Sequence, residues 1–198
     1  MKLELVSKYA FDSSRAAPLL FIHGAWHGAW CWDVHFLDFF ANNGFDAHAL
    51  SLRGHGESEG RERLRWVRIA DYVNDVARIA AQLPRSPIVI GHSMGGFVVQ
   101  KYLERHSAPA GMLLASVPPS GILRTVLRLA QRHPIAFAKA ISSVSLLPIV
   151  STPALARDAF FSEDLGEEEV AAYSARLQDE SLLTFFDSSP STFLNRKG

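Results

Sequence analysis

The motif Gly91-His92-Ser93-Met94-Gly95 is the feature that most constrains how this chain can fold. It follows the apolar run 88–90, which is typical of a buried strand, and it precedes a helical pattern over 97–104. A serine framed by glycines in this context is typical of a sharp strand-to-helix turn that presents the hydroxyl at the end of a sheet. We therefore expect Ser93 to be a nucleophile held with a positive φ angle.

The same turn could also be a glycine-rich turn in which Ser93 only caps a helix. A second motif upstream favours the nucleophile interpretation. Acyl transfer needs two N–H donors already aimed at one oxygen. The residue after the nucleophile, Met94, supplies one of them. The segment Phe21-Ile22-His23-Gly24 ends another buried run and leads into a loop that supplies the other. Ala25 is the first candidate for this donor, and Trp26 is the next.

Apolar runs alternate with helical patterns over the first 118 residues. This alternation predicts parallel βαβ units and a three-layer α/β fold, with residues 1–118 as its core. We expect strands at 3–11, 18–22, 45–52, 88–90 and 111–115, and helices at 30–43, 73–80 and 97–104.

The pattern changes at Pro118-Pro119, after which no convincing strand follows. Helical patterns occur at 123–130, 135–144, 153–161 and 167–177, with prolines between several of them. We therefore expect a helical cap over 119–187. The last segment, 188–198, has no periodicity, and we expect it to be disordered.

Composition excludes several classes of function. The 20 basic and 20 acidic residues cancel, which gives no footprint for nucleic acid or for an anionic membrane. The single cysteine excludes an intrachain disulfide and a paired-cysteine metal site, so we expect no metal. No window is apolar for long enough to span a membrane, and the N-terminus lacks the pattern of a signal peptide. These features favour a cytoplasmic protein.

Three motifs together make the chain resemble the α/β-hydrolase superfamily. They are Phe21-Ile22-His23-Gly24, Arg53-Gly54-His55-Gly56-Glu57-Ser58 and Gly91-His92-Ser93-Met94-Gly95-Gly96. The resemblance implies an esterase-like or lysophospholipase-like serine hydrolase, without a cofactor, that acts on esters of small to medium apolar acids. Segment 23–30 is similar to plant methylesterases and hydroxynitrile lyases. Segment 53–58 is similar to bacterial esterases and cofactor-free haloperoxidases, so the branch stays open.

The resemblance also implies a catalytic acid and a histidine after the nucleophile. The only histidines after Ser93 are His106 and His133, and both belong to segments expected to lie away from the site. The family's early position for the acid matches 116–120, which contains no carboxylate. We therefore expect a C-terminally truncated hydrolase with little or no turnover. A non-catalytic product or binding module is one alternative, and lyase-like or perhydrolase-like activity on the same fold is another.

Two further expectations concern surfaces. Aromatic side chains could line an acyl pocket, although ordinary packing between cap and core would also explain each of them. They are Trp26, Trp30, Phe137, Phe160 and Phe161, with Phe185 and Phe186 as further members. Strand 111–115, internal in the family, would become an exposed apolar edge here, which favours self-association.

Overall fold

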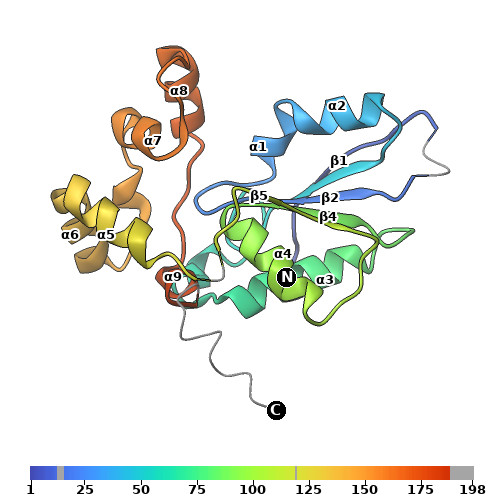
Figure 1. Ribbon diagram of the computed structural model, residues 1–198, viewed down its shortest axis with the longest axis horizontal. Helices are drawn as coiled ribbons and strands as arrows, with labels where there is room; N and C mark the ends of the chain where they lie inside the picture. The colour runs from blue at the N-terminus through green and yellow to red at the C-terminus, as the bar shows by residue number, and fades with distance from the viewer. Residues whose placement is uncertain (13–15, 119, 188–198) are drawn as a thin grey trace.

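Five strands form the central sheet of the computed structural model, which describes residues 1–12, 16–118 and 120–187 (Figure 1). The strands are β1 (Leu5–Lys8), β2 (Leu19–Ile22), β3 (Ala47–Leu50), β4 (Ile88–His92) and β5 (Gly111–Leu114). Their order across the sheet is β1-β3-β2-β4-β5. The four strands from β2 to β5 are parallel, whereas β1 runs antiparallel to β3 at the edge. The expected α/β sheet is confirmed, with an antiparallel edge strand that makes it mixed.

Helices cover both faces of this sheet (Figure 1). One face carries α1 (Trp30–Asp33) and α2 (Phe36–Asn42), which replace the single helix expected over 30–43. The break lies at His35, whose φ of −142° is not helical. The other face carries α3 (Ile69–Ala80) and α4 (Met94–Leu103), with the short 3-10 helix η1 (Arg61–Trp66) ahead of α3.

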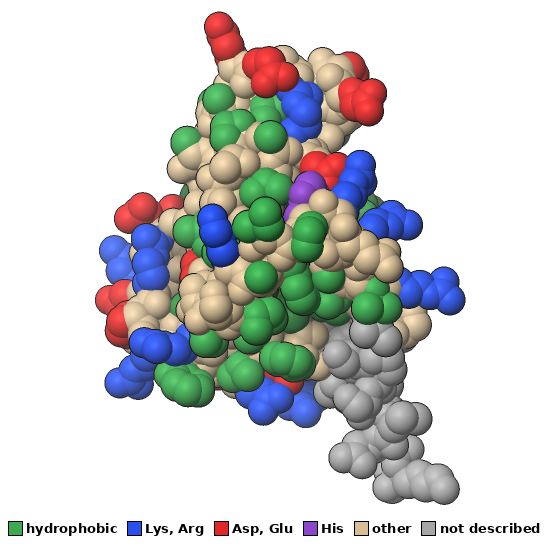
Figure 2. All heavy atoms as spheres, turned by 90° about the vertical axis from the view of Figure 1, so that its left-hand side faces the viewer, with side chains coloured by type: hydrophobic (Ala, Val, Ile, Leu, Met, Phe, Trp, Pro, Cys, Tyr) green, Lys and Arg blue, Asp and Glu red, His purple; other side chains and the backbone are tan. Residues whose placement is uncertain are grey.

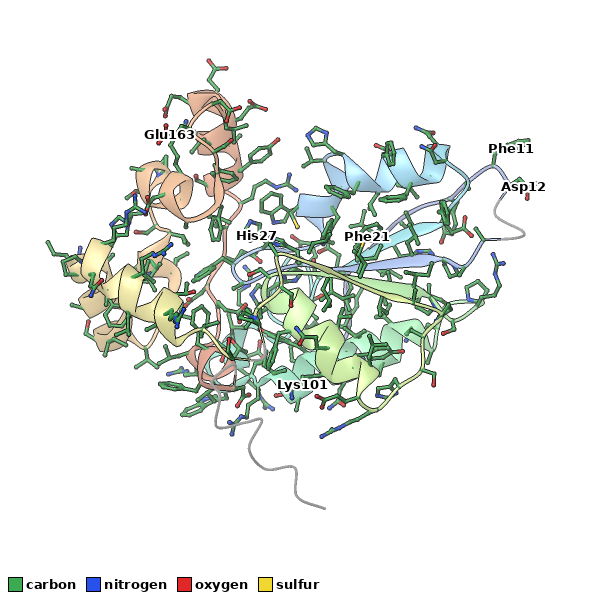
Figure 3. All side chains as sticks on the ribbon, in the orientation of Figure 1. Phe11, Asp12, Phe21, His27, Lys101 and Glu163 are labelled. Carbon is green, nitrogen blue, oxygen red and sulfur yellow. The ribbon has the colours of Figure 1, made fainter. Side chains whose placement is uncertain are left out.

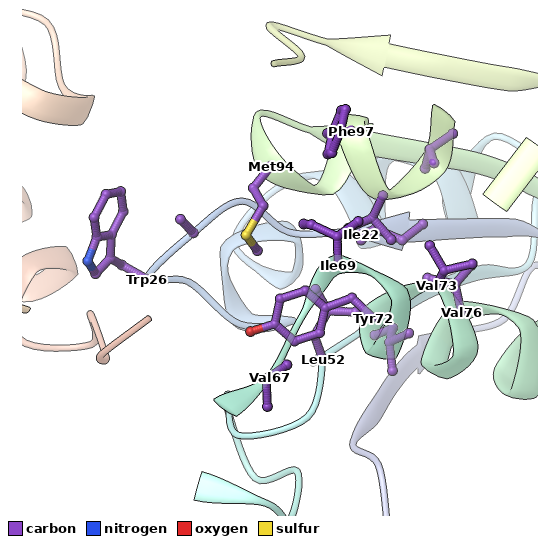
Figure 4. Packing of buried hydrophobic residues seen from close by; sticks show 14 of the residues in the cluster. Ile22, Trp26, Leu52, Val67, Ile69, Tyr72, Val73, Val76, Met94 and Phe97 are labelled. Carbon is purple, nitrogen blue, oxygen red and sulfur yellow. The ribbon is translucent and has the colours of Figure 1, made fainter. Parts of the chain in front are cut away.

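The larger part of the core lies between the sheet and the pair α3 and α4. Tyr72, Ile22 and Phe97 are fully buried there and pack around one another (Figure 4). The side chain of Met94 reaches into the same cluster, which anchors the first turn of α4 against the sheet. The turn that carries Ser93 is therefore supported by a packed interior on the α3 and α4 side.

A helical lobe lies beyond the carboxyl ends of the parallel strands, at the left of Figure 1. We define this lobe as residues 123–174. It contains α5 (Leu123–Arg132), α6 (Pro134–Ser143), the 3-10 helix η2 (Leu147–Ile149), α7 (Pro153–Phe160) and α8 (Glu167–Ser174). These helices match the four helical patterns predicted from the sequence. In the described part of the chain, no helix has the length and apolar character needed to cross a membrane.

The chain then returns to the core, and we call residues 175–187 the return segment. Gln178 donates its backbone N–H to the Trp26 carbonyl at 2.9 Å, and its side-chain oxygen accepts from the Gly56 amide at 2.7 Å. The segment ends in α9 (Leu182–Asp187), a helix that the sequence did not predict. Asp187 accepts a hydrogen bond from the Ile69 amide at 3.1 Å, so α9 also caps the first turn of α3.

Strand β5 forms one edge of the sheet and pairs with β4. Among the described residues, no strand pairs with its outer side. Met112 and Leu113 on β5 point to opposite faces of the sheet, and they are 49% and 46% exposed. An edge with open backbone groups and apolar side chains is a template for pairing with another chain.

We predict that the 198-residue chain self-associates through β5. Its mass in size-exclusion chromatography with light scattering should rise with protein concentration. The double variant Met112→Lys/Leu113→Lys should lower this association, because edge lysines oppose strand pairing. Leu127→Lys, a change at an exposed leucine of α5, serves as the control. A monomeric mass at every concentration would contradict the prediction.

Candidate active site

Ser93 lies at the turn between β4 and α4, with φ of 52° and ψ of −117°. The positive φ expected from the motif is therefore present. This backbone conformation is energetically unfavourable for a residue other than glycine. Backbone hydrogen bonds hold the turn. The Ser93 amide donates to the Leu114 carbonyl at 3.0 Å, and its carbonyl accepts from the Val117 amide at 3.1 Å. The Ser93 side chain is partly exposed and forms no hydrogen bond with the described residues.

The glycines of the motif are required by close backbone contacts. A Cβ atom on Gly91 would overlap the carbonyl of Gly95, and one on Gly95 would overlap the carbonyl oxygens of Ile22 and His23. These are backbone atoms that cannot rotate away. The first turn of α4 therefore lies directly against the end of β2, and only glycine allows this approach.

The loop after β2 passes beside the nucleophile turn. A Cβ on Gly24 would lie 3.2 Å from the Cβ of Ser93, so these two segments are in van der Waals contact. The amide N–H groups of Ala25 and Met94 form no hydrogen bond with any described residue. Both residues are buried. Two buried amide donors without a hydrogen-bond partner among the described residues therefore lie in neighbouring segments beside a partly exposed serine.

His23 fixes the shape of this loop. Its Nδ1–H donates to the Gly24 carbonyl at 2.7 Å, and its Nε2 accepts from the Leu52 amide at 3.0 Å. This pairing requires the neutral ring. Burial and the neighbouring His55 lower the pKa of His23 well below its usual value, which agrees with that requirement. His23 is therefore a structural residue of the loop.

Trp26 connects the loop to the helical lobe. Its φ of 65° is also left-handed. The indole N–H donates to the Leu146 carbonyl at 3.1 Å, while the Trp26 carbonyl accepts from the Gln178 amide. Two hydrogen bonds from separate parts of the chain thus hold a strained residue beside the Ala25 amide. The side chain of Trp26 points away from the sheet core and toward the lobe (Figure 4).

Most of the aromatic side chains expected to line a pocket meet between lobe and core. The Trp26 ring lies 5.6 Å from the rings of Phe160 and Phe185, and Phe160 and Phe161 are 6.2 Å apart. Trp30 stacks on His27, which lies between the lobe and α1 in Figure 3. Phe137 on α6 makes no ring contact with the described residues, and Phe186 is exposed.

These rings contact one another between the lobe and the core. Two surface grooves, of about 300 and 390 Å³, lie elsewhere, and Ser93 lines neither of them.

No histidine of the described chain hydrogen-bonds to Ser93. His27 donates to the Ala25 carbonyl at 2.7 Å, and burial lowers its pKa to about 4. The ring of His92 approaches Trp32 on the α1 side of the sheet. His106 stacks on Tyr102 at the end of α4, and His133 contacts Asp158 in the lobe at 2.7 Å.

The aspartates that follow Ser93 have structural partners. Asp158 pairs with Arg132 and His133, and Asp179 accepts from the amides of Leu146 and Leu147. Asp187 binds Arg68 and caps α3. Asp164 lies in an exposed turn before α8, where a hydrogen bond from Ser162 lowers the pKa of its carboxyl group. None of them orients a histidine toward Ser93.

A buried polar network that the sequence did not reveal joins the return segment to the core. Glu180 and His55 are both fully buried, and Glu180 Oε2 lies 3.2 Å from His55 Nε2, without the alignment of a hydrogen bond. The other carboxylate oxygen accepts from the Tyr72 hydroxyl and from the Ser181 amide, each at 2.7 Å. His55 and Glu180 are far apart in sequence, so no local pattern could have paired them.

This network holds charge inside the protein. Burial by itself would lower the pKa of His55, but the Glu180 carboxylate outweighs it and raises that pKa above its usual value. Burial and the same carboxylate raise the pKa of Tyr72. The His55–Glu180 pair therefore holds the return segment against the core, which also supports the hydrogen bond between Gln178 and Trp26. Among the described residues, no group of three or more histidine, cysteine or acidic side chains is placed to hold a metal ion.

Comparison with known proteins identifies relatives of this chain. A family model described as "Alpha/beta hydrolase family" matches residues 19–195. A non-heme haloperoxidase of Rhodococcus erythropolis is 32% identical over 116 residues, 54% of this chain and 40% of the relative. Protein phosphatase methylesterase 1 of Bos taurus is 38% identical over 90 residues, 44% of this chain and 24% of the relative. These matches span less than half the length of either relative.

Solved structures show the same fold. A carboxylesterase of Nitrososphaera gargenis superimposes with a TM-score of 0.65 and 20% identity, covering 96% of this chain and 66% of the other. A methylesterase of Arabidopsis gives 0.64 and 23% identity, covering 88% and 71%. At these identities the likeness establishes the arrangement of strands and helices.

We predict that Gly95→Ala destabilises the protein by about 3 kcal/mol or more, because the added methyl group overlaps backbone atoms. Gly111→Ala is the matched control. There the added Cβ would lie 2.6 Å from the end of the flexible Leu103 side chain, which can move away. Urea unfolding measures both changes. If Gly95→Ala were as stable as the control, this would contradict the close packing of Gly95 against the end of β2.

The buried pair predicts a pH dependence of stability. Folding raises the pKa of His55, so protonated His55 stabilises the folded protein. This stabilisation is complete below the unfolded pKa of about 6.5 and is lost as the pH rises through the folded pKa. Glu180→Gln should lower the free energy of unfolding at pH 6 by about 3 kcal/mol and flatten this slope. Glu168→Gln, at an exposed position on α8, should change neither. An unchanged slope in Glu180→Gln would contradict the charge pairing.

Proposed function

Because the chain belongs to the alpha/beta hydrolase family, we propose that it carries the nucleophile and the oxyanion-binding half of a serine hydrolase site. The observation that carries the proposal is the position of Ser93. It combines a positive φ, a partly exposed side chain and contact with a loop whose amide groups are unpaired. A serine that only capped α4 would direct its side chain to an amide of that helix, and Ser93 makes no such bond.

The proposed chemistry is acyl transfer. The Ser93 Oγ attacks the carbonyl carbon of an ester, a base takes the hydroxyl proton, and the carbonyl oxygen becomes an oxyanion. The amides of Met94 and Ala25 donate to that oxygen, with Trp26 as the next candidate donor. The N-terminus of α4 adds a favourable dipole at the same point. Collapse of the tetrahedral intermediate then breaks the ester C–O bond, the protonated base gives its proton to the leaving oxygen so that the alcohol departs, and the acyl group stays on Ser93 Oγ.

For the substrate, we propose an ester of a small to medium apolar acid. The support is the cluster of aromatic side chains between the lobe and the core, which includes Trp26, Trp30, Phe160 and Phe161. Aromatic rings favour contact with an apolar acyl chain. Names of several relatives, such as methyl jasmonate esterase 1 of Vitis vinifera, also denote ester cleavage.

We propose that the 198-residue chain turns over such esters slowly or not at all. A serine hydroxyl is a weak nucleophile at neutral pH unless a positioned base takes its proton. No histidine of the described chain forms a hydrogen bond with Ser93. The same observation favours a second candidate function, in which the fold binds an apolar ligand without turnover.

The test is an assay with p-nitrophenyl acetate, with Ser93→Ala run beside the unchanged chain. Loss of the base in serine hydrolases lowers kcat by roughly 10⁶, so the two proteins should be nearly indistinguishable. Ser93-dependent turnover at ordinary esterase rates, about 1 to 10³ per second, would show that a base is present. Substitution of His55, His92 and His133 would then locate it.

A further inference from the structure

The charges of the helical lobe are strongly segregated, although the chain as a whole is neutral. No aspartate or glutamate occurs between Glu104 and Asp158. Helices α5 and α6 fall inside this stretch and carry four basic residues, Arg124, Arg128, Arg132 and Lys139. The acidic residues of the lobe begin at Asp158 and gather around α8, where three consecutive glutamates open the helix. A net charge of zero therefore conceals a basic region and an acidic region.

The three arginines of α5 form a row on one side of the helix. Positions 124, 128 and 132 are four residues apart, so their side chains project from neighbouring turns of one face, and all three residues are exposed. The opposite face, with Val126, Leu129 and Ala130, is partly buried.

Most of this positive charge is uncompensated. Arg132 pairs with Asp158 at 3.0 Å. Arg124, Arg128 and Lys139 form no ion pair with any described residue. Their charges are therefore available to an external partner.

Apolar side chains are exposed among these charges. Ile135 at the start of α6 is 73% exposed, and Leu127, Ile141 and Val144 are each more than half exposed. Figure 2 shows hydrophobic side chains gathered on this side of the molecule, with Lys and Arg side chains near the margins and acidic side chains toward the top. A groove of about 390 Å³, mainly apolar, opens between Ile135, Lys139 and Leu155.

We propose that this α5–α6 face docks on an anionic lipid surface. A face that combines exposed aliphatic side chains with unpaired basic residues fits the boundary between acyl chains and negatively charged headgroups. The aliphatic groups would enter that boundary while the arginines and Lys139 meet lipid phosphates. Helices α5 and α6, of ten residues each, would lie in the plane of the surface. Nucleic acid fits less well, because the exposed side chains are aliphatic and offer no aromatic platform for bases. The proposal does not depend on the role of Ser93.

Co-sedimentation of the 198-residue chain with lipid vesicles tests the proposal. One set of vesicles contains phosphatidylcholine alone, and the other also contains phosphatidylglycerol. We expect binding to the second set only, and binding should weaken as salt is added. The triple variant Arg124→Glu/Arg128→Glu/Lys139→Glu should lower the partition coefficient roughly 100-fold. Ile135→Ser/Ile141→Ser keeps every charge and should lower it roughly tenfold.

The matched control is Arg63→Glu/Arg65→Glu/Arg105→Glu. It makes the same change in net charge at exposed positions outside the helical lobe. It should bind vesicles nearly as well as the unchanged chain, and circular dichroism should show that all variants are folded. Equal losses in both triple variants would overturn the proposal, since the attraction would then be nonspecific. Failure to bind anionic vesicles would overturn it as well. So would vesicle-independent dimerisation that Ile135→Ser/Ile141→Ser abolishes, because the face would then be covered by a second copy.

Discussion

The candidate site depends on the close contact between the end of β2 and the turn that carries Ser93. Gly95 lies so near the carbonyl groups of Ile22 and His23 that no side chain fits between them. This approach places the loop after β2 beside Ser93, with Gly24 in contact with the serine. Hydrogen bonds of His23 hold that loop, and the packing of Met94 holds α4. The strain at Ser93 persists because the surrounding structure fixes it from both sides.

A second set of contacts links this site to the helical lobe. Trp26 receives one hydrogen bond from the return segment and donates another to the lobe, and its ring packs against Phe160. The buried pair of His55 and Glu180 fastens the return segment to the core. Movement of the lobe would therefore act first on Trp26, the residue next to the proposed donor Ala25.

Local patterns in the sequence were sufficient to predict the sheet and the turn at Ser93. The run at 88–90 and the glycines around Ser93 specify a strand, a tight turn and a helix within a few residues, and the structure has all three. The antiparallel direction of β1, the helix α9 and the pair of His55 and Glu180 were not predictable in this way. Each depends on contacts between residues far apart in the chain. The segregated charge of the lobe was visible in the sequence, but the neutral total obscured it.

If Ser93 and its proposed amide donors Ala25 and Met94 are already assembled, a base that reaches Ser93 should activate its hydroxyl. Supplying the base from solution tests this directly. The chain would be incubated with p-nitrophenyl acetate in the presence and absence of imidazole, and mass spectrometry of its peptides would locate acetyl groups. We predict that imidazole promotes acetylation of Ser93 and that Ser93→Ala loses this modification. Acetyl groups confined to lysines and the N-terminus, with or without imidazole, would contradict it.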